Sequence, residues 1–169
     1  MTQRNRILIA VAILIVLIGA VLGIEALRRA NSQSQVAEGE PTLAPGSIPI
    51  YLDGRLAGSF SPTDLERLEQ VSFVDDEEGK TQEGWLLRDV LLLHVDQGDL
   101  QAETPILVTS NSRDKSAELT WAEVDDPANW LMFDLSGRGT LKLVSVLERL
   151  DVRDEWIQDV DEIRVGQTQ

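Results

Sequence analysis

One short stretch of the chain combines side chains that could bind an anion. Asn111, Arg113 and Lys115 alternate over five residues, directly after an apolar run. Arg and Lys donate charged hydrogen bonds to carboxylates and phosphates, and loops that follow strands often carry sites. The stretch is therefore a candidate surface for an anionic ligand or a partner carboxylate, with an ordinary solvated loop as the alternative.

Tryptophan provides the second candidate, because the chain has few other aromatic residues. The four indoles are Trp85, Trp121, Trp130 and Trp156. Trp side chains anchor both hydrophobic cores and binding pockets. Trp121 and Trp130 flank the break at Asp126-Pro127, so these two are the candidate walls of a groove for a ligand or partner. Packing in the core is the alternative.

Catalytic and metal-binding patterns are weak. The chain has no Cys and one His, which excludes disulfides, thiolate metal sites, Cys nucleophiles and multi-histidine zinc sites. Ser112 and Lys115 match a Ser-x-x-Lys pattern, but the companion Ser-Asp-Asn and Lys-Thr-Gly motifs are missing. We therefore predict no catalytic residue and no metal site. Weak calcium binding by the acidic runs 75–78 and 151–162 is the alternative.

The charge balance restricts the partners. The chain carries 15 basic and 29 acidic residues and a net charge of −14. Four of the basic residues and one acidic residue lie in the first 30 positions, which leaves 11 basic and 28 acidic residues for the rest. Such an acidic chain lacks the cationic face that nucleic acids or anionic lipid surfaces require.

An apolar segment near the N-terminus predicts a membrane anchor. Residues 7–24 contain no charge, and the segment 7–27 is long enough to span a bilayer as a helix. A cleaved signal peptide is the alternative, although the apolar run is long and Glu25, Leu27, Arg28 and Arg29, which follow it, fit a small-x-small cleavage site poorly. The positive-inside rule favours residues 1–6 in the cytoplasm and the remainder outside it. Residues 28–47 are polar with Pro and Gly, typical of a flexible linker.

The remaining segment, 48–166, predicts the domain that positions the candidate residues. Alternating or continuous apolar runs predict strands, and two segments predict short helices, one after Ser61-Pro62 and one over 85–94. The strands are expected at 48–53, 56–60, 71–74, 105–110, 117–121, 130–135, 140–146 and 159–165. Since helices and strands do not alternate regularly, we predict a compact α+β domain with mostly antiparallel pairing.

Three passages carry a resemblance to a known family. They are Glu83 to Leu91, a glycine followed by an aliphatic run; Asn129 to Val146, paired segments around a Gly-containing turn; and Trp156 to Val165, which ends in Ile-x-Val. Together they resemble the oxidoreductase molybdopterin-binding domain, with the sulfite-oxidase fold. The resemblance implies this fold over 48–166 and, in catalytic relatives, a molybdenum-binding cysteine upstream of the glycine-led helix.

The chain departs from that family where the metal would bind. Residues 71–84 contain no Cys and five carboxylates, which would repel an anionic pterin phosphate. We therefore expect a membrane-anchored extracytoplasmic binding or accessory module without molybdenum catalysis and without a cofactor. Its partner would be a membrane protein or a small ligand. The alternatives are a divergent molybdopterin-dependent oxidoreductase and a calcium- or solute-binding surface domain.

Overall fold

The computed structural model describes residues 43–135 and 137–166. The predicted cytoplasmic segment 1–6, the predicted span 7–27 and most of the predicted linker 28–47 lie outside these residues. Within the described ranges, no helix has the length and apolar character needed to cross a membrane.

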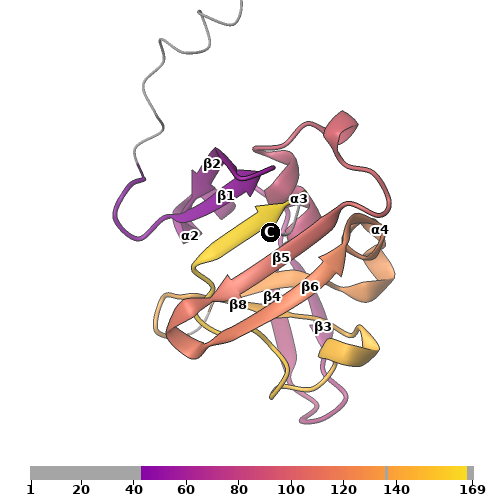
Figure 1. The fold of residues 1–169 in the computed structure, drawn as a ribbon. Coiled ribbons are helices and arrows are strands. Elements are labelled where there is room, and N and C mark those ends of the chain that lie inside the picture. The colour runs from indigo at the N-terminus through magenta and orange to yellow at the C-terminus, as the bar shows by residue number, and fades with distance from the viewer. Residues whose placement is uncertain (1–42, 136, 167–169) are drawn as a thin grey trace, which may run out of the picture. The chain divides into compact units, whose positions relative to one another are not determined.

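The described residues form the α+β domain that the sequence predicts, built mainly from sheet (Figure 1). The strands are β1 (Ile48–Leu52), β2 (Arg55–Phe60), β3 (Val71–Val74), β4 (Thr81–Leu86), β5 (Pro105–Ser110), β6 (Lys115–Thr120), β7 (Met132–Leu135), β8 (Leu141–Val144) and β9 (Glu162–Val165). The short helices are α2 (Pro62–Leu65), α3 (Leu87–Leu92) and α4 (Trp121–Asp125). Pairing is antiparallel except between β1 and β9.

The larger sheet has the strand order β2-β1-β9-β5-β6, visible side by side in Figure 1. Its last strand in sequence, β9, lies between β1 and β5. One face is buried, because Ile106 and Val108 of β5 and Ile163 of β9 are at most 1% exposed. Alternate side chains point to opposite faces of a strand, so the neighbours of these residues form an outer face.

The smaller sheet has the order β3-β4-β7-β8 and is buried on both faces. Phe133 and Leu143 join the main core, which also takes in the buried face of the larger sheet. Their neighbours Met132 and Val144 point the other way, into a second cluster with Trp156. This sheet therefore forms the middle layer between the main core and the second cluster.

Two helix predictions need correction. The helix expected over 85–94 begins only at Leu87, because Trp85 and Leu86 continue β4 and pair with Phe133 and Met132. Residues 43–135 and 137–166 also contain three short helices, whereas the sequence predicted two in the domain. The additional helix, α4, begins at Trp121, which the sequence placed at the end of a strand.

Candidate functional site

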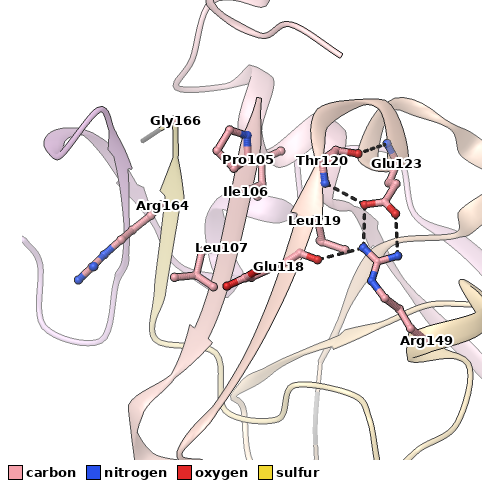
Figure 2. Close-up of a pocket in the computed structure, with 10 residues that line it drawn as sticks. All are labelled: Pro105, Ile106, Leu107, Glu118, Leu119, Thr120, Glu123, Arg149, Arg164 and Gly166. Atoms are coloured by element: carbon pink, nitrogen blue, oxygen red, sulfur yellow. Dashed lines mark hydrogen bonds and ion pairs between the residues drawn. The ribbon is translucent and has the colours of Figure 1, made fainter. Parts of the chain in front are cut away.

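A groove lies on the outer face of the larger sheet, over β9, β5 and β6 (Figure 2). Its volume is about 320 Å³. Residues from all three strands, from α4 and from the segment around 149 line it: Pro105, Ile106, Leu107, Glu118, Leu119, Thr120, Glu123, Arg149, Arg164 and Gly166. A groove of this size with an apolar floor and a few charged groups has the general character of a ligand or peptide site.

Strand pairing sets the order of the groups across the groove. Leu107 lies between Arg164 of β9 and Glu118 of β6 in the register of the sheet. Figure 2 shows the Glu118 carboxylate turned toward Leu107, whereas Arg164 extends away from it. Arg164 forms an ion pair with Glu162 at 2.5 Å. The middle of the groove therefore offers an apolar side chain beside a carboxylate.

An ion pair between Arg149 and Glu123 forms one wall of the groove. The guanidinium donates two hydrogen bonds to the carboxylate, at 2.6 and 2.7 Å, and a third to the Glu118 carbonyl oxygen at 3.0 Å. The same carboxylate accepts the Thr120 N–H at 2.8 Å, as part of the capping box that starts α4. Four hydrogen bonds, three of them donated by the Arg149 guanidinium, therefore hold this wall in place.

The pKa values of the pair follow from these contacts. Hydrogen bonds from Arg149, together with the Thr120 N–H, hold the pKa of Glu123 below its usual range although burial opposes this. The Glu123 carboxylate in turn raises the pKa of Arg149. Both groups are therefore charged at neutral pH, and a ligand would meet a neutralised wall on this side.

The same ion pair covers the exposed edge of β6. Pro105 and Thr109 turn their carbonyl oxygens toward Gly166 and Asp161, on the β9 side of β5. Backbone groups alternate in direction along an antiparallel strand, so Thr120, Glu118 and Ser116, which lie opposite Pro105, Leu107 and Thr109, direct their backbone groups away from β5. Arg149 and Glu123 thus bind the backbone groups that a further strand would use.

Substitution of Arg149 by Ala is expected to increase self-association. The change frees the Glu118 carbonyl at the sheet edge, while loss of a half-exposed ion pair costs only about 1 kcal/mol. Light scattering on the full chain in detergent should show a larger dimer fraction than in the parent. Arg164→Ala is the matched control, because Arg164 bonds a side chain on its own strand. Equal dimer fractions in both variants would contradict the edge-covering role.

The structure places Asn111, Arg113 and Lys115 against the segment 154–161. Asn111 donates through its backbone and side chain to Asp161, both at 2.9 Å. Arg113 donates to Asp159 at 2.6 Å. Lys115 donates to the backbone carbonyl oxygens of Asp154 and, at 3.3 Å, Trp156. All three candidates thus tie the β5–β6 hairpin to a distant segment.

Asp159 is the centre of this junction. Its carboxylate accepts the Thr140 hydroxyl at 2.6 Å and the Arg113 Nε at 2.6 Å, and Arg138 approaches at 3.3 Å. The hydrogen bonds from Thr140 and Arg113 hold the pKa of Asp159 below its usual range. Asp159 also has a φ of 55°, a left-handed conformation that Asp tolerates better than most residues. The residue thus joins three segments that are distant in sequence.

Trp121 and Trp130 lie in different surroundings. Trp121 is 5% exposed and belongs to the main core. Trp130 is partly buried against the second cluster, with its ring centroid 6.1 Å from that of Phe73. Neither side chain lines the groove of Figure 2. The structure therefore separates the two indoles into two hydrophobic clusters.

The segment that would correspond to the family's metal-binding loop is a tight hairpin. β3 and β4 pair from Val71 opposite Gly84 to Val74 opposite Thr81, which leaves six residues for the turn. The buried Asp75 carboxylate accepts the Glu78 N–H at 2.6 Å and the Gln82 amide at 2.7 Å. Both hydrogen bonds, and chiefly the one from the Glu78 N–H, hold the pKa of Asp75 below its usual range. Anionic oxygens used by the turn itself do not fit a centre that needs a soft thiolate ligand.

In the part of the chain that the structure describes, no three His, Asp or Glu side chains converge to hold a metal ion. No protein-family model matches the chain, and no curated protein matches it either.

Sequence reasoning missed the residues that line the groove. Glu123 had a local signal, because Thr120-x-x-Glu123 is a capping-box pattern that predicts a helix start. Arg149 had none, since its partners Glu118 and Glu123 are 31 and 26 residues away.

Proposed function

We propose that the chain is a membrane-anchored extracytoplasmic binding module with a sulfite-oxidase-like fold and no molybdenum catalysis. Its groove binds an extended, positively charged segment of a membrane-protein partner. The observation that carries this proposal is the groove over β9, β5 and β6, with Leu107 as an apolar floor beside the Glu118 carboxylate.

The N-terminal sequence supports the membrane part of the proposal. The uncharged segment within 7–27 has the length and composition of a bilayer span, and residues 28–47 provide a tether of roughly 25 Å. A domain tethered in this way would stay close to the bilayer without being fixed against it. Its nearest partners would then be proteins of the same membrane.

Charge supports the nature of the partner. The residues after position 30 carry 11 basic against 28 acidic groups, so the field around the domain attracts cations. Within the groove, Arg149 is neutralised by Glu123 and Arg164 by Glu162. The Glu118 carboxylate therefore gives the groove a net negative charge. A basic side chain of the partner segment could pair with this carboxylate, while an apolar side chain next to it in that segment packs on Leu107.

Site-specific photocrosslinking in native membranes tests the proposed function. A benzophenone amino acid at Leu107 is expected to give a discrete adduct with a membrane protein. The same amino acid at Val74, which is 58% exposed on β3 of the other sheet, should not give that adduct. The same adduct from both positions, or no adduct from Leu107, would contradict the groove as the binding site.

A charge reversal tests the stated chemistry. With the photoreactive residue at 107, Glu118→Lys should reduce the adduct yield by about threefold or more, because it replaces an attractive contact by a repulsive one. Glu66→Lys changes the net charge equally on an exposed residue outside the groove and is the matched control. An equal loss in both variants would assign the effect to overall charge and not to the groove.

Metal and pterin analysis of the purified full chain separates the proposal from the oxidoreductase alternative. Stoichiometric molybdenum and pterin, from a molybdenum-replete host, would overturn the proposed function. Specific thermal stabilisation by millimolar calcium but not magnesium would instead favour the cation-binding alternative.

A further inference from the structure

A second pocket, separate from the groove, collects positive charge in this acidic protein. It has a volume of about 210 Å³ and lies between the β7–β8 turn and residues 153–159. Arg138, Lys142 and Arg153 line it, and Asp159 is its one acidic lining residue. The pocket thus gathers three cations in a chain whose net charge is −14.

The cations that line this pocket differ in how strongly they are paired with carboxylates of the protein. The Asp159 carboxylate already has two short hydrogen bonds, from Thr140 and Arg113. Arg138 reaches the same carboxylate only at 3.3 and 3.4 Å, and its side chain is 63% exposed. Its donors are therefore weakly used by the protein and open to a ligand.

Arg153 also lines the pocket; its guanidinium donates to the Glu78 carboxylate at 2.8 Å, and its backbone N–H donates to Glu77 at 3.0 Å. Its partner Glu78 is shared, because the same carboxylate oxygen also binds Lys80 at 2.7 Å. Lys142, in contrast, is balanced by Asp134 at 2.9 Å and donates to Gln82 at 2.9 Å. The Asp159 and Glu78 carboxylates are thus each shared between two cations, and the lining of the pocket itself holds three cations against one carboxylate.

We propose that this pocket binds a small oxyanion, a phosphate group in its simplest form, through the guanidinium groups of Arg138 and Arg153. Guanidinium groups match the spacing of phosphate oxygens and form charge-assisted hydrogen bonds with them. The site is independent of the groove and of the function proposed for it. A soluble metabolite or a lipid headgroup could present this group, and the acidic domain favours the soluble form, because a bilayer of anionic lipid would repel it.

Calorimetric titration of the full chain in neutral detergent with inorganic phosphate tests this site. Arg138→Gln is expected to weaken binding by about tenfold, the effect of one charge-assisted hydrogen-bond pair. Arg67→Gln removes an exposed Arg that lines neither the pocket nor the groove and should bind phosphate like the parent. Asp159→Asn removes the competing carboxylate and should tighten binding, and circular dichroism checks that each variant is folded.

Two results of this titration would contradict the proposed phosphate site. No phosphate binding by the parent, or equal affinities for the parent and Arg138→Gln, would overturn the site. Glycerophosphoglycerol, the soluble headgroup of phosphatidylglycerol, forms a second arm of the titration. Tighter binding of inorganic phosphate than of this diester would support a soluble ligand, and the reverse order would overturn that part of the proposal in favour of a lipid headgroup.

Discussion

Replacement of Gly84 by Ala is expected to destabilise the domain by about 3 kcal/mol or more, which lowers its melting temperature by over ~10 °C. A Cβ atom at this position would lie 1.9 Å from the carbonyl oxygen of Phe133 and 2.6 Å from its carbonyl carbon. Both are backbone atoms of the neighbouring strand β7, and they cannot move aside without breaking the sheet. Thermal unfolding of the full chain, followed by circular dichroism, measures the effect.

Gly98→Ala provides the control for this prediction. A Cβ atom at Gly98 meets no atom within 4 Å, and its backbone conformation is open to other residues. Its stability should change by less than ~0.5 kcal/mol, as for most surface substitutions. A loss of similar size at both positions would show that the close approach of β4 and β7 is not what requires Gly84.

Replacement of Asp159 by Ala is expected to cost about 3 kcal/mol. The change removes two short hydrogen bonds to the carboxylate, leaves Arg113 and Arg138 without their counter-ion, and places Ala in a left-handed conformation. Asp159→Asn keeps the tolerance for that conformation and an oxygen acceptor, so it should cost about half as much. Chemical denaturation of the three proteins measures both differences, and losses under ~0.5 kcal/mol would contradict the role of Asp159 as a junction.

The effect of the Asp159 charge should depend on pH. The folded protein holds the pKa of Asp159 below the ordinary value of 3.8, chiefly through Thr140 and then Arg113. The carboxylate therefore stabilises the fold above pH 3.8, and this contribution is lost as the pH falls from there through the folded pKa. The stability difference between the parent and Asp159→Asn should be full at neutral pH and shrink in acid. A difference that stays constant down to the acid limit would mean that the charge does not contribute.

Local patterns in the sequence predicted much of the secondary structure. Alternating apolar residues predicted β1 closely, a continuous apolar run predicted β5, and the Ser61-Pro62 start predicted α2. The error at Trp85 and Leu86 has a physical cause, since an aliphatic run fits either a helix or a buried strand. Pairing of these two residues with Phe133 and Met132, 48 and 46 positions later, selects the strand.

The candidate anion-binding stretch at 111–115 likewise depends on partners that are distant in the sequence. Its residue types were visible in the sequence, but their partners Asp159 and Asp161 come from a segment almost fifty residues away. Only the folded chain shows that Arg113 forms a short ion pair with Asp159, whereas Arg138 pairs with it weakly and lines a pocket. Side-chain chemistry is local information, whereas the balance of charges around a site depends on which segments meet.

By itself, the sequence determined the acidic charge, the absence of thiolate chemistry, the apolar segment near the N-terminus and the α+β class, because these depend on composition and short-range periodicity. The tertiary structure decided the insertion of β9 between β1 and β5, the groove on the outer face and the cationic pocket. Each of these depends on contacts between residues that are far apart in the chain. Such contacts are selected by the burial and hydrogen bonding of the whole domain and leave no local pattern in the sequence.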